Sequence, residues 1–324
     1  MKISKMLNKI SLLMGVIALT TSCESGDNTF PDFDYTSVYF ANQYPIRTVE
    51  LGEDLYVDLT NDNNHMVSIN AATGGAYTNS KNIIINYSVD PSLCQGLSFK
   101  GGSAIEVMPS SYYSLESENI VIPFGQIQGG VKVHLNDAFF NDPKSINCTY
   151  VIPVRINSVE GADSILSEKN FVLYAVKFVN PWHAKYLRRG VDNITTTSGT
   201  VRNIRHQQYV EKDEIQSVTT LGYKQAGMVI GIKDGAGKSH ECNLILTFDD
   251  NGACTVSTNT NGFTASGKGS FVIKGEKKSM GGIDRNALYL DYSIASESLG
   301  MTVSTKDTMV VQTRNVKPEY FSVE

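Results

Sequence analysis

Apolar and polar residues alternate one by one along most of this chain, and a period of two is the signature of extended strands. Val131, Val133 and Leu135 are separated by a lysine and a histidine, and residues 287–294 repeat the pattern. Successive side chains of a strand point to opposite faces of a sheet, so each pattern gives one buried and one exposed face. No stretch has the capped, 3.6-residue period of a long helix. The sequence therefore predicts an all-β protein.

Glycine-containing pairs lie between the predicted strands. Tight hairpin turns need residues that tolerate positive φ, so these pairs are expected to be turns. The pairs are Gly129-Gly130, Asp234-Gly235, Asn251-Gly252, Asn261-Gly262 and Gly281-Gly282. Further strands are expected at Ser37–Ala41, Leu55–Leu59, Asn82–Val89, Tyr150–Ile156, Phe171–Phe178, Met228–Ile232, Asn243–Phe248, Ser270–Lys274 and Met309–Thr313. One short helix is expected at Ala184–Gly190.

A domain boundary is predicted at Asn180-Pro181, where a strongly apolar strand ends. The proline lacks the N–H that a sheet ladder needs. The preceding range, 34–179, has the length and strand number of an immunoglobulin-like sandwich. The range 180–324 has closely spaced glycine hairpins, which suit an antiparallel up-and-down barrel or meander. The expected architecture is a sandwich followed by a barrel.

The first 22 residues have the order of a secretory signal: basic, apolar, small, then cysteine. Three lysines precede the apolar run 10–19, and Thr20-Thr21-Ser22 directly precede Cys23. An apolar run of about ten residues is too short for the ~20 that a helix needs to cross a bilayer. The segment resembles a bacterial lipoprotein signal, in which the cysteine is acylated and becomes the mature N-terminus, although Thr20 replaces the usual leucine. We expect lipidation at Cys23, followed by a flexible tether at 23–33.

The tether begins with the polar, acidic stretch 24–28. In Bacteroidota lipoproteins, an acidic patch directly after the cysteine resembles the signal for display on the outer face of the outer membrane. Ser25 and Gly26 interrupt the acids here, and an ordinary acidic linker is the alternative. Several acyl chains on one cysteine give durable anchoring. We expect a lipid-anchored outer-membrane protein that faces the cell surface and contacts the membrane only through its acylated N-terminus.

The chain that follows the leader is acidic. Three of the 28 Lys and Arg residues lie in the leader, which has no acidic residue, so 25 basic residues remain against 33 acidic ones and the net charge is near −8. Such a chain lacks the basic surface that nucleic acid or anionic lipid heads require. We expect neutral partners and no nucleic acid. The remaining length, about 302 residues, is sufficient for two domains with separate cores.

Four cysteines follow the leader, namely Cys94, Cys148, Cys242 and Cys254. Exported proteins form disulfides, but these four have no CxxC or other metal-ligand spacing. A tight turn at 249–252 would place Cys254 opposite a residue near Thr247 and not opposite Cys242. The favoured interpretation is four buried thiols that act as small apolar groups.

Several segments resemble one group of Bacteroidota surface lipoproteins. Residues 108–115 (MPSSYYSL), 122–125 (IPFG) and 148–156 (CTYVIPVRI) are similar to an uncharacterised immunoglobulin-like domain, the N-terminal module of many lipoproteins linked to polysaccharide-utilisation systems. Residues 285–292 (RNALYLDY) and 307–310 (DTMV) resemble the closing strands of the calycin-like C-terminal domain of that group. The resemblance spans most of the chain. It implies a lipocalin- or calycin-like barrel and glycan handling, without implying catalysis.

The short motifs of catalytic and metal sites are incomplete. Residues 234–239 contain Gly-Lys-Ser, but a phosphate loop would need glycine at Ile232 and a helix afterwards, so a glycine hairpin is expected. Ser103 lacks the final glycine of a nucleophile elbow. The five histidines form no HxH or HExxH pair, and residues 247–258 lack the acidic first and last positions of a calcium loop. We expect no metal and no cofactor.

Paired carboxylates for glycoside hydrolysis need only be close in space, and nothing in the sequence selects a pair. Asp291 lies within an apolar strand, and its expected partner is Arg285 or Arg314 inside the barrel. Because no catalytic constellation is present, we expect a protein that is not an enzyme.

The single tryptophan stands at the predicted domain junction. Trp182, His183, Tyr186, Arg188 and Arg189 form an amphipathic cluster there. Neutral sugars stack their C–H faces on flat rings while their hydroxyls bond polar side chains, and clefts often form between domains. We take these five residues as the candidate glycan site. The alternative is that Trp182 seals the interface between the domains.

The expected function is a non-catalytic cell-surface protein that binds oligosaccharides and works beside outer-membrane glycan-import proteins. A structural or adhesin-like lipoprotein is the alternative, with an apolar interaction patch and no affinity for sugar. A third hypothesis, a small lipophile inside the barrel, requires that the barrel enclose a cavity.

Overall fold

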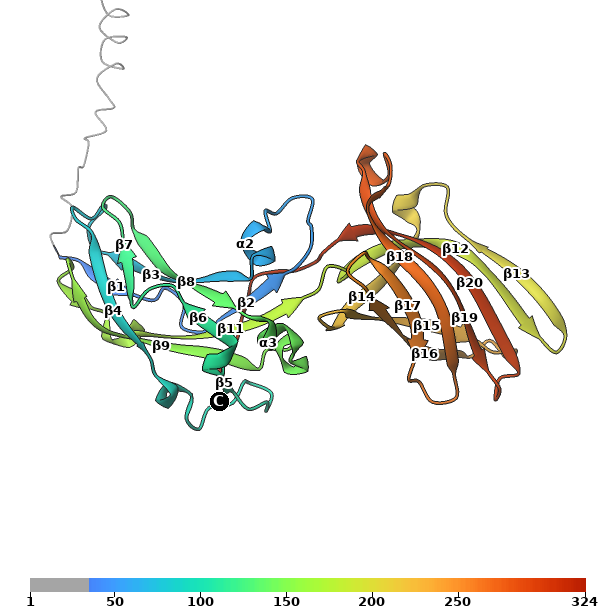
Figure 1. Cartoon of the computed structure of the whole chain (residues 1–324), viewed down its shortest axis with the longest axis horizontal. Coiled ribbons are helices and arrows are strands. Elements are labelled where there is room, and N and C mark those ends of the chain that lie inside the picture. The colour runs from blue at the N-terminus through green and yellow to red at the C-terminus, as the bar shows by residue number, and fades with distance from the viewer. Residues whose placement is uncertain (1–34) are drawn as a thin grey trace, which may run out of the picture.

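The computed structural model describes residues 35–324, which form two β domains arranged side by side (Figure 1). The first contains two curled, mixed sheets, and the second is a closed antiparallel barrel. The predicted fold class, a sandwich followed by a barrel, is confirmed. Cys23 and most of the predicted tether lie outside the described residues.

The first domain packs two sheets against each other. One has the strand order β10 (Ser164–Ile165), β1 (Ser37–Tyr39), β3 (Met66–Gly74), β8 (Gln128–Leu135) and β6 (Tyr113–Leu115). The other has the order β21 (Glu319–Tyr320), β2 (Pro45–Glu50), β11 (Phe171–Val179), β9 (Tyr150–Glu160), β4 (Ile83–Val89) and β7 (Asn119–Ile122), with β5 (Glu106–Val107) paired to β9. Alternate residues from both sheets, such as Val131, Val133, Ile83 and Ile85, meet in one apolar core.

The second domain is a barrel of consecutive antiparallel strands that closes between its first and last members. Its strands are β12 (Ala184–Thr196), β13 (Gly199–Arg205), β14 (Glu214–Gly222), β15 (Gln225–Lys233), β16 (Ser239–Phe248), β17 (Ala253–Thr258), β18 (Thr264–Glu276), β19 (Arg285–Ser296) and β20 (Met301–Thr313). The long strand β12 pairs with β20 along one edge; along the other it pairs first with β14 and then with β13. Closure pairs both edges of the eight barrel strands, whereas β13 pairs only with β12 and keeps one open edge.

The helices are short and lie between strands. The α-helices are α2 (Thr60–Asn63) and α3 (Asp137–Asn141). The 3₁₀ turns are η1 (Pro91–Cys94), η2 (Ser110–Tyr112), η3 (Pro143–Ile146), η4 (Ser167–Lys169), η5 (Val210–Lys212) and η6 (Met280–Gly282). No helix among residues 35–324 is long and apolar enough to span a membrane.

Two predicted elements and one predicted turn are wrong. Gly129-Gly130 is not a turn but lies within β8, where the two glycines pair with Ala71 and Asn70 of β3. Ala184–Gly190 is not a helix but the start of β12, because pairing on both edges with β14 and β20 outweighs a weak local preference. Leu55–Leu59 is not a strand but a loop. The carboxylate of Asp54 accepts the backbone N–H groups of Tyr56 and Val57, and that local bonding competes with a sheet ladder.

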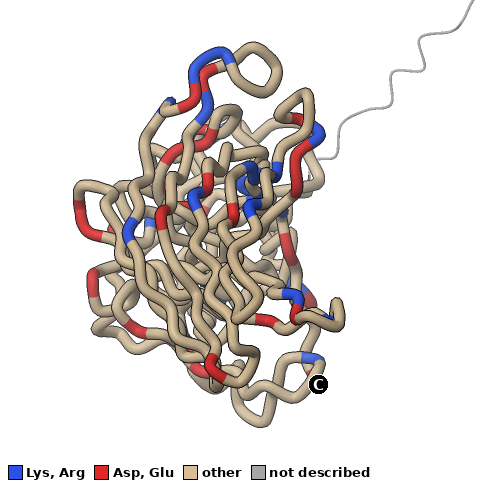
Figure 2. Tube along the Cα trace, turned by 90° about the vertical axis from the view of Figure 1, so that its right-hand side faces the viewer, with Lys and Arg blue, Asp and Glu red and all other residues tan. Residues whose placement is uncertain are grey.

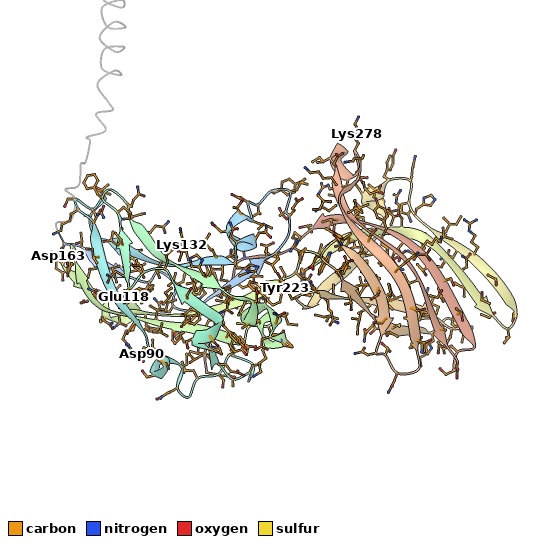
Figure 3. The ribbon with its side chains drawn as sticks, viewed as in Figure 1. Asp90, Glu118, Lys132, Asp163, Tyr223 and Lys278 are labelled. Carbon is orange, nitrogen blue, oxygen red and sulfur yellow. The ribbon has the colours of Figure 1, made fainter. Side chains whose placement is uncertain are left out.

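The chain crosses between the domains twice. It enters the barrel after Val179 and returns after β20, so that β21 pairs with β2 of the first domain. The predicted range of the second domain, 180–324, therefore ends with a segment that packs on the first. Tyr223, labelled in Figure 3, extends from the β14–β15 turn to the first domain, where its ring centre lies 5.7 Å from that of Phe140. Two crossings and this shared aromatic contact hold the domains together.

Charged residues of both signs are interspersed on the surface. Figure 2 shows basic and acidic segments alternating along the loops and strands in that view. Several of them form exposed pairs, such as Lys224 with Asp250 and Lys277 with Asp284. Isolated exposed pairs contribute little to stability, about 0–1 kcal/mol each.

Candidate functional site

A hollow of about 420 Å³ lies where the two domains meet, and we call it the junction cleft. It is lined by Glu53, Asn63 and His65 of the first domain, by Trp182 at the crossing, and by Lys224 and Phe271 of the barrel, among others. Clefts of this size between domains are common ligand sites. The prediction of a cleft beside Trp182 is therefore supported by geometry.

Aromatic rings form one wall of the junction cleft. Trp182 stacks on Phe248, with ring centres 3.8 Å apart and planes inclined by 7°. Its side chain is only 7% exposed, so Trp182 both closes the end of the barrel and borders the cleft. Phe271 and Tyr223 line the same hollow. Flat rings beside polar groups are the composition expected for sugar recognition.

Asn180 fixes the backbone behind this wall. Its side-chain N–H groups donate to the carbonyl oxygens of Gly222 and Gln225, and its amide oxygen accepts the N–H of His183. The fully buried amide thus ties the crossing to the β14–β15 turn. Arg314, at the end of β20, donates to the carbonyl of Asn180 as well. The sequence predicted a boundary at Asn180, but it did not predict that the Asn180 side chain would bond the crossing to the β14–β15 turn.

The loop after β2 forms the opposite lip of the junction cleft. The side chain of Asn63 in α2 accepts the N–H of Gly52 and donates to its carbonyl, which anchors the loop at its base. Gly52 has φ of +100° and packs against Pro181, so a side chain would not fit there. Tyr56 and Val57, farther along the loop, are exposed. The stretch wrongly predicted as a strand, Leu55–Leu59, continues this loop and lines a neighbouring hollow of about 780 Å³.

The charges that line the cleft are mostly negative. Glu53, Asp249 and Asp250 face one lysine, Lys224. Asp250 pairs with Lys224, and Asp249 accepts the N–H of Asn251 within its turn. The Glu53 carboxylate makes no hydrogen bond with any described residue. The neighbouring hollow of about 780 Å³ is also lined by Glu53.

His65 lies at the floor of the cleft in a left-handed backbone conformation, with φ of +57°. Its ring packs on Phe140 at 4.1 Å between centres. Burial lowers its pKa, while the carboxylate of Asp137 opposes the shift. The ring is therefore mostly neutral at physiological pH and can act as hydrogen-bond donor and acceptor.

The predicted site residues do not share one pocket. Trp182 lines the junction cleft, whereas the next residue, His183, lies on another hollow near Lys177. The Nδ1 atom of His183 accepts the N–H of Thr220. Burial, with the charges of Arg314 and Lys177, lowers the pKa of His183 to about 4. Its ring is held neutral as part of the fold.

Tyr186 and Arg188 point into the barrel. The buried Tyr186 donates its hydroxyl to the carbonyl of Trp182, 2.7 Å away. Arg188 pairs with Asp307 at 2.9 Å and donates to the hydroxyl of Tyr292. These contacts leave neither side chain free for a ligand at the junction. Alternation along β12 puts Tyr186 and Arg188 on the inner face of the barrel and Arg189 on the opposite face, so adjacency in sequence does not bring these three to the cleft.

Arg189 and Arg205 complete this set of paired charges. Arg189 pairs with the buried carboxylate of Asp213 at 2.6 Å. Arg205 of β13 extends over the strand to Asp192 and Asp307, each at 2.6 Å. The pair of Arg188 with Asp307 lies inside the barrel beside a continuous cluster of buried apolar side chains.

Other predicted groups have structural roles. Asp291 is exposed and pairs with Lys306 at 3.2 Å, so its expected partner, Arg285 or Arg314 inside the barrel, is wrong. It lies on the outer face because Leu290 and Tyr292 take the inner one. Residues 234–239 form the predicted hairpin, in which Asp234 accepts two backbone N–H groups.

The cysteines are unbridged in the described chain. Cys254 pairs with Phe248 in the sheet register, one residue from the predicted Thr247. Burial raises the pKa of Cys148 to about 11 and that of Cys254 to about 12, so both thiols are protonated at neutral pH. Among residues 35–324, no group of three or more His, Cys, Asp or Glu side chains is arranged to hold a metal ion.

Known domains match both halves of the chain. Residues 181–315 match the domain of unknown function DUF5627, and residues 33–163 match an N-terminal domain of another family. A crystal structure of a protein of unknown function from Bacteroides ovatus is similar over 90% of this chain and 99% of that one, with 46% identity and a TM-score of 0.86. The chain belongs to the family of that Bacteroides protein. The match extends over both domains, so that protein has the same two-domain architecture.

More distant neighbours also come from Bacteroides. One is an auxiliary nutrient binding protein from Bacteroides thetaiotaomicron, with 12% identity, a TM-score of 0.37, and coverage of 82% of this chain and 90% of that one. Another is a candidate carbohydrate binding protein from Bacteroides ovatus, with 12% identity, a TM-score of 0.29, and coverage of 87% and 99%. At these scores the likeness says nothing about the ligand of this family. No curated protein matches the chain.

Proposed function

We propose that this protein is a non-catalytic, lipid-anchored cell-surface protein that binds neutral oligosaccharides in the junction cleft. The observation that supports this most directly is the lining of the cleft. Trp182, Phe271 and Tyr223 offer flat apolar rings, and Asn63 and Glu53 offer polar groups. Sugars need both kinds of contact at once.

The charge of the lining favours a neutral sugar. Three carboxylates and one lysine leave the cleft negative, which repels anionic ligands. Hydroxyl groups can donate to the Glu53 carboxylate, and hydrogen bonds to charged acceptors are the stronger ones. The ligand class we propose is therefore a neutral oligosaccharide.

The non-catalytic role is supported by the engagement of the acids. Asp249 is held by its own turn and Asp250 by Lys224, which leaves Glu53 without a second free carboxylate beside it in the lining. Hydrolysis of a glycosidic bond by the common mechanism needs two carboxyl groups with separate roles.

The N-terminal signal-like segment supports the proposed location at the cell surface. The order of residues in 1–22, with acylation at Cys23, would anchor the protein in the outer membrane and expose both domains to the cell surface. A surface sugar-binding protein would pass its ligand to glycan-import proteins of a polysaccharide-utilisation system. Labelling of intact cells with a membrane-impermeant reagent tests the exposure.

The binding test uses residues 24–324 and a panel of neutral plant and host oligosaccharides. Trp182 is the sole indole, so its fluorescence reports the cleft, and calorimetry gives the affinity. Glu53→Ala should weaken binding by about tenfold because a charged hydrogen bond is lost. Trp182→Phe keeps a ring on Phe248 and tests the wall of the cleft. Glu118→Ala, an exposed glutamate on the first domain, is the matched control (Figure 3).

Failure of every neutral sugar to bind, or binding that neither cleft variant changes, would reject the proposal. The adhesin-like alternative would then be the favoured hypothesis. That alternative has one supporting observation: Val201, Ile204 and Ile215 are exposed on neighbouring strands outside the barrel. The third hypothesis, a lipophile inside the barrel, is disfavoured because apolar side chains of the barrel strands pack on one another there in one buried cluster.

A further inference from the structure

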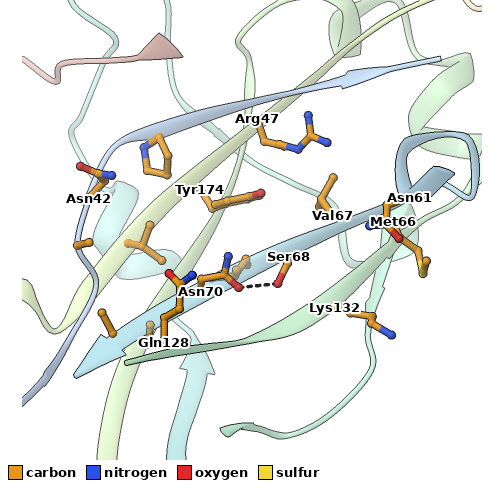
Figure 4. A pocket seen from close by; sticks show the side chains of 16 residues that line it. Asn42, Arg47, Asn61, Met66, Val67, Ser68, Asn70, Gln128, Lys132 and Tyr174 are labelled. Atoms are coloured by element: carbon orange, nitrogen blue, oxygen red, sulfur yellow. Dashed lines mark hydrogen bonds between the residues drawn. The ribbon is translucent and has the colours of Figure 1, made fainter. Parts of the chain in front are cut away.

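A separate hollow of about 580 Å³ lies in the first domain, and we call it the sandwich pocket. Strands β2 and β11 of one sheet and β3 and β8 of the other form its walls (Figure 4). Its lining shares no residue with the junction cleft. It is therefore a distinct candidate site, which the sequence did not indicate.

Tyr174 is the central group of the sandwich pocket. It comes from β11, is only 8% exposed, and lies between Arg47 and the Ser68–Asn70 pair in Figure 4. Its hydroxyl has no hydrogen-bond partner among residues 35–324, yet it borders the hollow. A ligand in the pocket would supply the missing bond.

Carboxamides surround this hydroxyl. Asn42, Asn61 and Gln128 line the pocket, and their side chains make no hydrogen bond with any described residue. Asn70 accepts the Ser68 hydroxyl at 2.7 Å and keeps its amide N–H groups available. Each carboxamide both donates and accepts, which matches the hydroxyl groups of a sugar.

Glycine in the facing strand makes room for this arrangement. Gly130 of β8 is paired with Asn70 of β3. A Cβ atom at residue 130 would lie 1.9 Å from the Asn70 amide oxygen and 2.5 Å from the Ser68 hydroxyl. The small residue therefore lets the Ser68–Asn70 pair lie flat along the pocket.

The charge of the sandwich pocket is opposite to that of the junction cleft. Arg47 and Lys132 line it, and its lining contains no carboxylate. Arg47 is bonded to Asp62 and to the carbonyl of Thr48, which fixes its guanidinium in place. Lys132 is exposed and has only a loose pair with Glu116, at 3.6 Å. Lys132 is thus available to an anion.

We propose that the sandwich pocket binds a sugar that bears a carboxylate, of the uronic-acid class. The carboxamides and Tyr174 bond its hydroxyl groups, and Lys132 faces its carboxylate. The proposal does not depend on the junction cleft, since either site can fail alone.

The test is calorimetry of residues 24–324 with two matched trisaccharides, trigalacturonate and neutral galactotriose. Trimers of glucuronate, mannuronate and guluronate extend the acidic arm of the panel. We expect saturable binding of at least one acidic trimer and about tenfold weaker binding of the neutral one. Tyr174→Phe should weaken binding by about tenfold, the loss expected for a bond to a buried hydroxyl. Its melting temperature should stay that of the unmodified protein.

Two controls and a second pocket variant accompany this test. Tyr320→Phe changes an exposed tyrosine of β21 and should leave binding unchanged. Glu53→Ala, in the junction cleft, should leave the affinity for the acidic trimer unchanged. Asn70→Ala provides a second variant in the pocket if Tyr174→Phe lowers the stability.

The proposal would be overturned by no saturable binding of any acidic trimer or by binding of the acidic trimer that neither pocket variant weakens. Binding of the neutral trimer with equal affinity would also overturn it where Tyr174→Phe weakens that binding and Glu53→Ala does not, because the sandwich pocket would then make no distinction by charge. Competition by acetate as strong as by the trimer would also overturn it, since the site would then recognise a bare anion and not a sugar.

Discussion

The barrel interior and the sandwich pocket contain similar residue types in opposite states. In the barrel, Arg188 and Tyr292 both bond Asp307, a carboxylate with no exposed side-chain surface. In the sandwich pocket, the hydroxyl of Tyr174 borders a hollow and has no partner among the described residues. The comparison separates two kinds of polar side chain. Those that are paired in the interior stabilise the fold, and those that are unpaired beside a hollow are available to a ligand.

The physical basis is the cost of desolvation. A buried charge is tolerated only when it is paired and hydrogen-bonded, and removal of one partner leaves the other uncompensated. Within the barrel, such pairs join β12, β13, β19 and β20. They therefore hold the closure of the barrel together.

The largest effect should come from Asp307→Asn, which removes the charge opposite Arg188 and Arg205. Breaking a buried pair from one side costs about 3–5 kcal/mol, and we expect that loss in the free energy of unfolding measured with urea. Asp291→Asn is the matched control on the adjacent strand. Its side chain is 55% exposed in the pair with Lys306, so the cost should be about 0–1 kcal/mol. Equal losses for the two variants would contradict the conclusion that the buried pairs of the barrel stabilise the fold more than the exposed ones.

The same substitution made in both regions should give different results. Tyr292→Phe deprives Asp307 of one donor and Arg188 of one acceptor, and should cost about 1–3 kcal/mol. Tyr174→Phe removes a hydroxyl without a partner, and stability should change by less than about 0.5 kcal/mol. Thermal and urea unfolding measure both. A large loss of stability for Tyr174→Phe would show that this hydroxyl is bonded within the protein in solution. It would then count against a ligand site at Tyr174.

A smaller effect, dependent on pH, is expected at His183. Its pKa in the folded protein is about 4, below the ordinary value of 6.5, because burial and nearby cations disfavour the charged ring. The unfolded chain therefore binds the proton first as pH falls, so the stability due to the neutral ring is complete above about pH 6.5 and declines toward pH 4. His183→Gln should lose less stability than the unmodified protein between pH 7 and pH 4.5, in urea unfolding at each pH. Identical losses would contradict a structural role for the neutral ring.

The fold could be predicted from local pattern because alternation and turn chemistry are encoded in neighbouring residues. The apolar run of β11, the hairpin at 234–239 and the inward series Leu288, Leu290 and Tyr292 all follow from a period of two. The boundary predicted at Asn180-Pro181 directly follows β11, which ends at Val179.

The sites could not be predicted in the same way because their members are distant in sequence. Arg188 and Asp307 are 119 residues apart, and Tyr174 meets Asn70 only when the two sheets pack. The cluster around Trp182 was chosen by adjacency, but His183 lines another hollow and Arg188 points into the barrel. The lipid site at Cys23 stays a prediction, since it lies outside the described residues.

The smallest expected effect concerns charge in the sandwich pocket. Lys132→Gln keeps the length and polarity of the side chain but removes its charge, and an exposed lysine contributes only about 0–1 kcal/mol to a pairing. The affinity for trigalacturonate should therefore fall by a few-fold, and the dependence of that affinity on salt should flatten. The affinity for the neutral trimer should not change. Calorimetry at two ionic strengths measures both affinities. An unchanged salt dependence would mean that the charge of Lys132 does not contribute to binding, and that Tyr174 and the carboxamides recognise the ligand through its hydroxyl groups alone.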